Sequence, residues 1–447
     1  MGCRQFTLSA RPISGKERRH AAPARAAINN VAMTRNLAQW LEYQQTVHRR
    51  DIVLGLERVA DVAGRLGLGR PGRRVITVAG TNGKGSTVAF IEAIARAAGL
   101  RVGAFTSPHL LRYNERIRID GQDAGDDALV AAFERIEAAR GDVALTYFEF
   151  CALAALVLMQ DARLDLAILE VGLGGRLDAV NIVDPDVAII TTVDLDHQEY
   201  LGEDREAIGV EKAGILRAGK PCVLAERDPP SSVLRYAYAI GAFAIRGYSD
   251  YLVEERPGGW RWREPGYQID LPNPGLEASA QRGNAAAAIA ALRALDLRIS
   301  DRAIRDGVRG ARAPGRLQRL PGRPERVLDV AHNPQGARQL GEWLAAHRVP
   351  TVAVFSALGD KDIAGIVAPV APHVRAWYLG PITDAGPRGL DVVALEARVR
   401  AAQPDAVLHA HPSLSAALAA AAKAIGPDGR VLVYGSFHTV AEALAAD

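Results

Sequence analysis

The stretch VITVAGTNGKGSTVAFIEAIARAAG, residues 75–99, predicts a phosphate-binding loop between a strand and a helix. Residues 75–79 form a short β-branched run typical of a buried strand, and the apolar residues after Ser86 recur at helical spacing. The glycines of the GTNGKGS loop let backbone N–H groups point inward, beside the positive end of the helix and the Lys84 ammonium. Gly85 separates Lys84 from Ser86, which departs from the usual G-x-x-x-x-G-K-[ST] spacing.

The composition indicates an ordinary globular protein. A length of 447 residues predicts two or three domains, and no apolar run is long enough to span a membrane. The net charge is +3, but residues 1–32 hold six basic residues and one acid, so the rest of the chain carries −2. The folded part therefore offers no electrostatic basis for nucleic-acid binding. Three scattered cysteines are typical of a reducing cytoplasm, where we expect the protein.

Residues 1–32 show no apolar periodicity, and three interpretations remain open for them. They are a disordered tail, an Arg-rich transit peptide, or leader sequence translated from a misassigned start upstream of Met33.

Further apolar runs predict more strands, and polar residues follow where these strands end. One run ends at Ser107, another covers residues 164–169 and ends in Glu170, and a third leads to His197. Repeated strand-loop-helix units predict a mostly parallel, doubly wound α/β sheet, in which ligands gather at the carboxyl ends of the strands. A carboxylate, an imidazole and the hydroxyls of Ser86 and Ser107 at this edge are consistent with Mg²⁺ beside a triphosphate, although imidazole is an unusual Mg²⁺ ligand.

The later part of the chain predicts a hairpin at residues 258–271, a helix at residues 281–295 and, after Pro314 and Gly315, a smaller α/β domain. Asn284 is interpreted as either a helix cap or an amide that recognises the nucleotide base. Arg316, after the break, is placed to reach across to a nucleotide. Further polar residues follow strand ends in this domain: Asp329, His332, Asp360, Lys361 and His438.

The chain carries, in this order, the motifs GTNGKGS, SPHLLRYNERI, TYFE, LEVGLGGRLDAVN, DHQEYLG, EKAGI, APGR, LDVAHNP, DKD and GSFHTV. It therefore resembles the folylpolyglutamate synthase and dihydrofolate synthase family, a branch of the Mur-ligase superfamily, from residue 34 to near the C-terminus. The resemblance implies an ATP- and pterin-binding P-loop domain at residues 33–312 and a smaller Rossmann-like α/β domain of the glutamate-ligase type at residues 313–447. A monomer is also expected from the architecture of the family.

The resemblance also implies a reaction. An ATP-dependent ligase would join L-glutamate to dihydropteroate, forming dihydrofolate, and to tetrahydrofolate, in each case through an acyl phosphate. Catalysis would be mainly positioning and charge neutralisation, with Mg²⁺ on the triphosphate of the co-substrate ATP.

Site residues follow from the resemblance position by position. The implied catalytic residues are Lys84, Lys212, which would be carbamylated, and His332. The implied metal ligands are Ser86, Ser107, Glu170 and His197. The implied ATP contacts are Thr81, Asn82, Gly83, Lys84, Gly85, Ser86, Asn284, Arg316 and Asp329. The implied pterin-side contacts are Asp51, Ile52, Val53, Leu54, Thr146, Tyr147, Phe148, Glu149, Leu177, Asp178 and Ala179. One departure is Val180, where the family often has threonine.

Three alternatives remain. A peptidoglycan-precursor ligase would share the fold and the chemistry, but its loop is expected without the extra glycine. A monofunctional dihydrofolate synthase is not separated from the bifunctional enzyme by these motifs. A nucleotide-binding switch without ligase activity would not need the carboxylate, imidazole and lysine at the strand ends.

Overall fold

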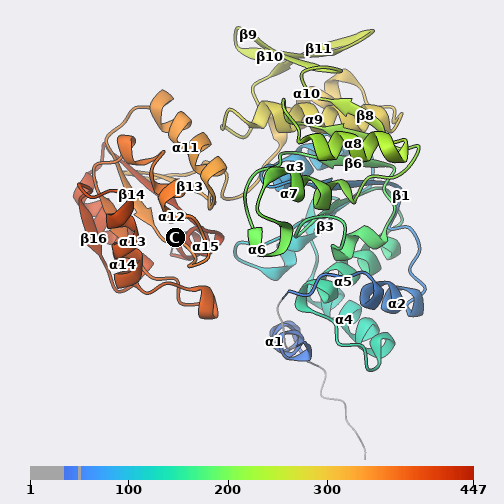
Figure 1. Cartoon of the computed structure of the whole chain (residues 1–447), viewed down its shortest axis with the longest axis horizontal. Coiled ribbons are helices and arrows are strands. Elements are labelled where there is room, and N and C mark those ends of the chain that lie inside the picture. Colours follow the sequence, from blue (N-terminus) through green and yellow to red (C-terminus); the bar gives the residue numbers. More distant parts are fainter. Residues whose placement is uncertain (1–34, 49–51, 447) are drawn as a thin grey trace, which may run out of the picture. The chain divides into compact units, whose positions relative to one another are not determined.

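The computed structural model describes residues 35–48 and 52–446 (Figure 1). Within these ranges no helix is both long enough and apolar enough to cross a membrane. The predicted tail, residues 1–32, lies outside the described residues, so its three interpretations stay open. Both large sheets described below belong to one compact unit that starts at Asn36.

An eight-stranded sheet organises the first part of the described chain, here called the first domain. Its strand order is β4-β3-β2-β5-β1-β6-β7-β8. The strands are β1 (Gly72–Ala79), β2 (Val102–Phe105), β3 (Ile117–Ile119), β4 (Gln122–Asp123), β5 (Leu164–Glu170), β6 (Val187–Ile190), β7 (Pro221–Leu224) and β8 (Phe243–Arg246). The six strands β2, β5, β1, β6, β7 and β8 are paired in parallel in that order. Beside β2, the strands β3 and β4 form an antiparallel edge. The mostly parallel sheet that the sequence predicts is confirmed.

Helices cover both faces of this sheet because alternate strand residues point to opposite sides. Val75 and Leu169 pack toward one face, and Ile76 and Ile168 pack toward the other. The first face carries α1 (Leu37–Val47), α2 (Glu57–Arg65), α4 (Asp126–Arg140), α5 (Tyr147–Ala162), α7 (Arg205–Ala213) and α8 (Ser231–Ile240). The second carries α3 (Lys84–Ala97), α9 (Gln281–Ala294) and α10 (Asp301–Gly310). The predicted doubly wound arrangement therefore holds on both faces.

A small antiparallel sheet lies beyond α9 and α10 (Figure 1). It consists of β9 (Leu252–Arg256), β10 (Gly259–Glu264) and β11 (Tyr267–Pro272), so the predicted hairpin is β10 and β11, and β9 is a third strand that the sequence did not indicate. Trp262 is fully buried, stacks on Tyr251 with ring centroids 5.8 Å apart, and donates from Nε1 to the Ala286 carbonyl at 3.2 Å. This sheet therefore packs against α9 through Trp262.

A six-stranded sheet organises the described residues after Gly315, here called the second domain. Its strands are β12 (Gln318–Leu320), β13 (Glu325–Asp329), β14 (Thr351–Phe355), β15 (Trp377–Leu379), β16 (Leu408–Ala410) and β17 (Arg430–Tyr434). The order is β12-β13-β17-β14-β15-β16, parallel except for β12. One face packs on α11 (Pro334–Ala346), α12 (Ile363–Val367) and α13 (Val392–Ala402), and the other on α14 (Leu414–Ile425) and α15 (Phe437–Ala445). The predicted smaller α/β domain is present, while its exact boundaries stay a prediction.

Trp262→Ala should destabilise the first domain by about 3–5 kcal/mol, because it leaves a cavity under α9 and removes an indole hydrogen bond. Urea unfolding followed by circular dichroism measures the loss. Arg261→Ala is the matched control, since that side chain lies on the opposite face of β10 and pairs with Asp270 at the surface. An equal loss in both variants would contradict the assigned role of Trp262.

Candidate functional site

The carboxyl ends of the strands in both domains face a shared cavity of about 370 Å³. The first domain contributes the loop between β1 and α3 and the residues that follow β2, β5 and β6. The second domain contributes the segment around Arg316 and the residues that follow β13, β14 and β17. Every residue predicted to be catalytic, to bind ATP or to bind metal lines this cavity. The structure therefore brings those residues together, although their individual roles stay predictions.

The loop after β1 curls as the glycine pattern predicts. The Thr81 amide donates to the Thr192 carbonyl at 2.8 Å, and the Lys84 ammonium lies inside the curl, donating to the carbonyls of Gly80 at 2.9 Å and Thr81 at 3.2 Å. Gly83 is the N-cap of α3 and has φ +86°. Backbone amides at a helix N-terminus, together with a lysine held by their loop, form a suitable site for phosphate oxygens.

Asn284 packs directly against this loop. A β-carbon added to Gly83 would lie 2.6 Å from Asn284 Oδ1. The possibility that Asn284 caps its helix is wrong, because α9 begins at Gln281 with Ala280 in the capping position. Asn284 instead faces the cavity one turn into the helix, and its amide donates to Gln281 Oε1 at 3.0 Å. The remaining interpretation, an amide that recognises the nucleotide, stays a prediction.

Glu170 places a buried carboxylate close to Lys84. Only 4% of Glu170 is exposed, and its Oε2 accepts the Ser107 amide at 3.3 Å. Burial raises the pKa of Glu170, and the nearby Lys84 opposes that shift; burial also lowers the pKa of Lys84. Each group therefore stabilises the charged form of the other against the effect of burial.

The predicted metal ligands meet at the same edge. No three His, Cys, Asp or Glu side chains gather into a metal cluster within residues 35–48 and 52–446. The predicted set contains two of these residue types, Glu170 and His197, with the hydroxyls of Ser86 and Ser107. Burial lowers the pKa of His197 to about 4, so its imidazole is neutral at pH 7 and can coordinate metal. These donors fit a cation that also takes phosphate or water oxygens.

Lys212 is a buried lysine whose amine has a pKa near neutral pH. It lies on α7, lines the cavity and is only 3% exposed, which differs from the solvated position usual for a helix lysine. Burial, followed by repulsion from Lys84, lowers its pKa to about 7. Roughly half of the Lys212 amine is therefore uncharged at neutral pH, which is the form that acts as a nucleophile.

The second domain supplies Arg316, Asp329 and His332 to the cavity. Burial lowers the pKa of Arg316, while Asp329 and Glu170 stabilise its charge, so this guanidinium interacts with carboxylates of both domains. The Asp329 carboxylate accepts hydrogen bonds from the backbone amides of Leu317 at 2.9 Å and Ala331 at 2.8 Å. It therefore ties the segment next to Arg316 to the segment next to His332. His332 Nδ1 contacts the Val330 carbonyl at 2.8 Å, which leaves Nε2 directed toward Asp196 at 3.5 Å.

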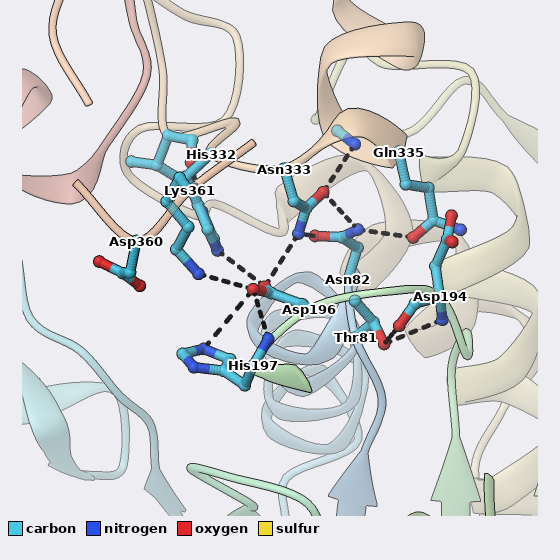
Figure 2. A network of polar contacts seen from close by, with 12 residues as sticks. Thr81, Asn82, Asp194, Asp196, His197, His332, Asn333, Gln335, Asp360 and Lys361 are labelled. Atoms are coloured by element: carbon cyan, nitrogen blue, oxygen red, sulfur yellow. Dashed lines mark hydrogen bonds and ion pairs between the residues drawn. The ribbon is translucent and has the colours of Figure 1, made fainter. Parts of the chain in front are cut away.

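A polar network connects the two domains beside this cavity, and sequence reasoning did not predict these contacts (Figure 2). Asp196, next to His197, pairs with Lys361 of the second domain at 2.6 Å. Burial alone would raise the pKa of Asp196, but its contacts with His332 and Lys361 lower it far below the ordinary value. The sequence placed Lys361 and the neighbour of Asp196, His197, after strand ends, yet nothing in it indicated that Asp196 and Lys361, 165 positions apart, form an ion pair.

Of the residues predicted to contact the pterin side, those that the structure describes do not line the cavity. Asp51 lies outside the described residues. Thr146 and Glu149 form the capping box of α5, and Glu149 also pairs with Arg58 at 2.9 Å. The predicted segments do meet, because Arg58 also binds the Val53 carbonyl at 3.0 Å.

Asp178 likewise supports its own loop, accepting the amides of Gly172 and Leu173 at 2.9 Å each, and burial raises its pKa to about 6. Phe148 packs over Gly172, and Gly55 donates to the Leu177 carbonyl at 3.3 Å. These side chains therefore have structural roles, and their contact with substrate stays a prediction.

Gly83→Ala should weaken ATP binding at least about tenfold, because the new β-carbon meets Asn284 and the backbone conformation is strained for an L-residue. Calorimetric titration with a non-hydrolysable ATP analogue measures the change. Gly64→Ala is the matched control, since nothing lies within 4 Å of the added β-carbon there. Unchanged affinity in Gly83→Ala would mean that this part of the loop does not hold the nucleotide.

Comparison with known proteins agrees with this geometry. Residues 78–242 match the Mur ligase middle domain, and residues 315–437 match the glutamate ligase domain of Mur ligases. The dihydrofolate synthase/folylpolyglutamate synthase of Escherichia coli (strain K12) is 45% identical over 411 residues, which cover 91% of this chain and 94% of that protein.

Two solved structures extend the likeness to the fold. E. coli FolC in complex with DHPP and ADP matches with a TM-score of 0.87 at 44% identity, covering 92% of this chain and 97% of that one. A bifunctional folylpolyglutamate synthase/dihydrofolate synthase with Mn, AMPPNP and L-glutamate bound matches with a TM-score of 0.85 at 46% identity, covering 92% and 98%. This chain belongs to the dihydrofolate synthase/folylpolyglutamate synthase family of Mur ligases.

Proposed function

We propose that this protein joins L-glutamate to dihydropteroate, forming dihydrofolate, and to tetrahydrofolate, extending its glutamate chain. As a Mur ligase it is an ATP-dependent enzyme. The observation that carries the proposal is the shared cavity, in which the phosphate loop of the first domain faces Arg316 and His332 of the second. A reaction that first transfers a phosphoryl group and then an acyl group needs both halves around one reacting centre.

In the proposed reaction the acceptor carboxylate attacks the γ-phosphorus of ATP and the bond to ADP breaks. The amine of L-glutamate then attacks the acyl carbon and loses a proton as the amide bond forms, and the carbon–oxygen bond to phosphate breaks, so that inorganic phosphate leaves with the electron pair. The loop around Lys84 binds the phosphates, and Arg316 offsets negative charge from the opposite side. A divalent cation held near Glu170, His197, Ser86 and Ser107 would neutralise and orient the triphosphate. The E. coli relative bound to ADP and the relative bound to Mn and AMPPNP support a nucleotide and a divalent cation.

Both activities are proposed because the curated E. coli relative carries both in its name. A monofunctional dihydrofolate synthase remains the second candidate, since the predicted pterin-side segments meet in the fold and nothing in them reports on longer substrates. We also propose that the enzyme acts as a monomer in the cytoplasm. One chain supplies both sides of the cavity, and Cys151 and Cys222 are free and buried thiols.

The function is tested by incubating the purified protein with ATP, Mg²⁺ and L-glutamate, with dihydropteroate in one arm and tetrahydrofolate in the other. Mass spectrometry should find one added glutamate in both arms. Product from dihydropteroate alone would identify the monofunctional enzyme. No product in either arm, from protein that binds ATP, would overturn the proposal. Lys84→Ala serves as the inactive control, because it removes the ammonium from the phosphate loop.

We further propose that Lys212 is carbamylated. Its neutral amine attacks CO₂, an N–C bond forms and one proton is released, which converts a cation into an oxygen ligand. With a pKa of about 7, the neutral fraction rises about tenfold from about pH 6 to about pH 8. The same shift makes the stability of the fold depend on pH. Between about pH 7 and the ordinary pKa of 10.5, Lys212 is protonated in the unfolded state but largely neutral in the folded state. The free energy of unfolding therefore rises with pH over this range.

Incubation with ¹³C-bicarbonate should therefore give a carbamate signal by NMR that grows over the same pH range and is absent from Lys212→Arg. Lys220→Arg is the control, because that side chain is 45% exposed and pairs with Asp186. A signal that persists in Lys212→Arg, or the absence of any signal from fully active enzyme, would contradict the modification.

A further inference from the structure

Asn333 occupies a position at which one side chain contacts three parts of the structure. It is the N-cap of α11, where its Oδ1 accepts the Gly336 amide at 3.0 Å. The same side chain pairs reciprocally with Asn82 of the phosphate loop, accepting from Asn82 Nδ2 and donating to Asn82 Oδ1, each at 3.0 Å. It also donates from Nδ2 to Asp196 Oδ2 at 3.2 Å (Figure 2).

These partners determine the orientation of the amide. The Gly336 N–H can only donate, so it requires the Asn333 oxygen, and the Asp196 carboxylate only accepts, so it requires the Asn333 nitrogen. With both ends assigned, Asn82 can form its two bonds to Asn333 in one orientation only. Asn333 is 3% exposed, and both of its Nδ2 contacts cross to the first domain. The bonds to Asn82 and Asp196 are part-buried, so a partner left without its hydrogen bond is only partly satisfied by water.

Neighbouring contacts strengthen the same connection. Gln335, two residues further on, accepts from Asn82 Nδ2 at 2.5 Å and from Thr192 Oγ1 at 3.2 Å. Lys361, whose side chain is 7% exposed, pairs with the other Asp196 oxygen at 2.6 Å. Asn82 lies on the loop that follows β1, and Asp196 lies on the loop that follows β6. These two loops of the first domain therefore both contact the second domain through Asn333.

We propose that Asn333 is a positioning residue for the ligase reaction, which holds the second domain against the phosphate loop through Asn82 and against the β6 loop through Asp196. The proposal rests on the proposed function. Asn333 touches no reacting atom in this scheme. It acts through the adjacent His332 and through Arg316, which face the phosphate loop only when the two domains are held together.

An amide is required at this position for an electrostatic reason. A carboxylate would still cap α11 and would still accept from Asn82 Nδ2. Its second oxygen, however, would face the Asn82 amide oxygen, which cannot donate a hydrogen bond, and the Asp196 carboxylate, which carries the same charge, so two hydrogen bonds are replaced by repulsion. Asn333→Asp therefore separates the role in the helix from the role between the domains.

The experiment compares Asn333→Asp with the wild-type enzyme in ATP-dependent glutamate addition. We expect kcat to fall at least about tenfold and nucleotide affinity to fall less, because the first domain alone supplies the phosphate loop while Arg316 contributes from the second. Helix content measured by circular dichroism should be unchanged, since the cap of α11 is retained. Asp391→Asn is the matched control: Asp391 caps α13 in the same domain, accepts the Ala394 amide and is exposed, so this exchange should leave kcat unchanged.

A double-mutant cycle with Asp196→Asn tests the direct contact. The double variant exchanges amide and carboxylate between positions 196 and 333, so one donor–acceptor pair is restored. Its kcat should exceed the value expected from multiplying the two single effects. Simple multiplication, a kcat for Asn333→Asp within about twofold of wild type, or an equal loss in Asp391→Asn would overturn the proposal. If Asn333→Asp does not fold, Asn333→Ser keeps a capping hydroxyl that is too short to bridge the domains and must show the same loss.

Hydrogen exchange separates this proposal from the proposed function. Without substrates, amides of the phosphate loop and of residues 333–338 should exchange faster in Asn333→Asp than in Asp391→Asn. Faster exchange combined with no glutamate addition by the wild type would refute the function and leave the contact established. Normal glutamate addition by Asn333→Asp together with unchanged exchange would refute the positioning role alone.

Discussion

The burial of several charges at the carboxyl ends of β1 and β5 is the constraint on which the site depends. Lys84, Glu170 and Arg316 lie in one cavity, and each would be unfavourable there alone because desolvation penalises an isolated charge. Together they partly compensate one another, and the lysine and arginine leave positive charge for phosphate oxygens. The same environment explains Lys212, because burial, followed by repulsion from Lys84, lowers the pKa of its amine to about 7.

Neither large sheet provides a complete site. The first domain holds the phosphate loop and the predicted metal ligands, while Arg316 and His332 come from the second. Parallel sheets suit this division, since all their strands end at one edge and two such edges can face each other across a cavity. The arrangement requires that the domains be held in a defined relation, and the contacts around Asp196 and Asn333 do this with paired amides and ion pairs rather than with apolar packing alone.

Acidic residues in the remaining predicted segments have mainly structural roles. Glu149 forms part of a capping box and pairs with Arg58, and Asp178 binds the amides of Gly172 and Leu173. These bonds shape the loops that follow β5 and precede α5, so motif residues that the family resemblance assigns to substrate contact also build the surface that such a contact would need. The residue type at a motif position therefore does not by itself show whether the side chain contacts substrate or stabilises the loop around it.

The sequence alone determined the fold class, the phosphate loop and the set of residues that gather at the strand ends. These depend on local patterns: β-branched runs, helical periodicity, glycines before a helix, and the rule that parallel strands end at one edge. Only the tertiary structure decided that Asn284 lies against Gly83 rather than capping its helix, that β9 completes a third sheet, and that Lys212 is buried. It also decided that Asn82 and Asn333, 251 positions apart, form a reciprocal amide pair. Such contacts carry no local signal, because they arise where two separately folded surfaces meet and their geometry depends on the packing of both.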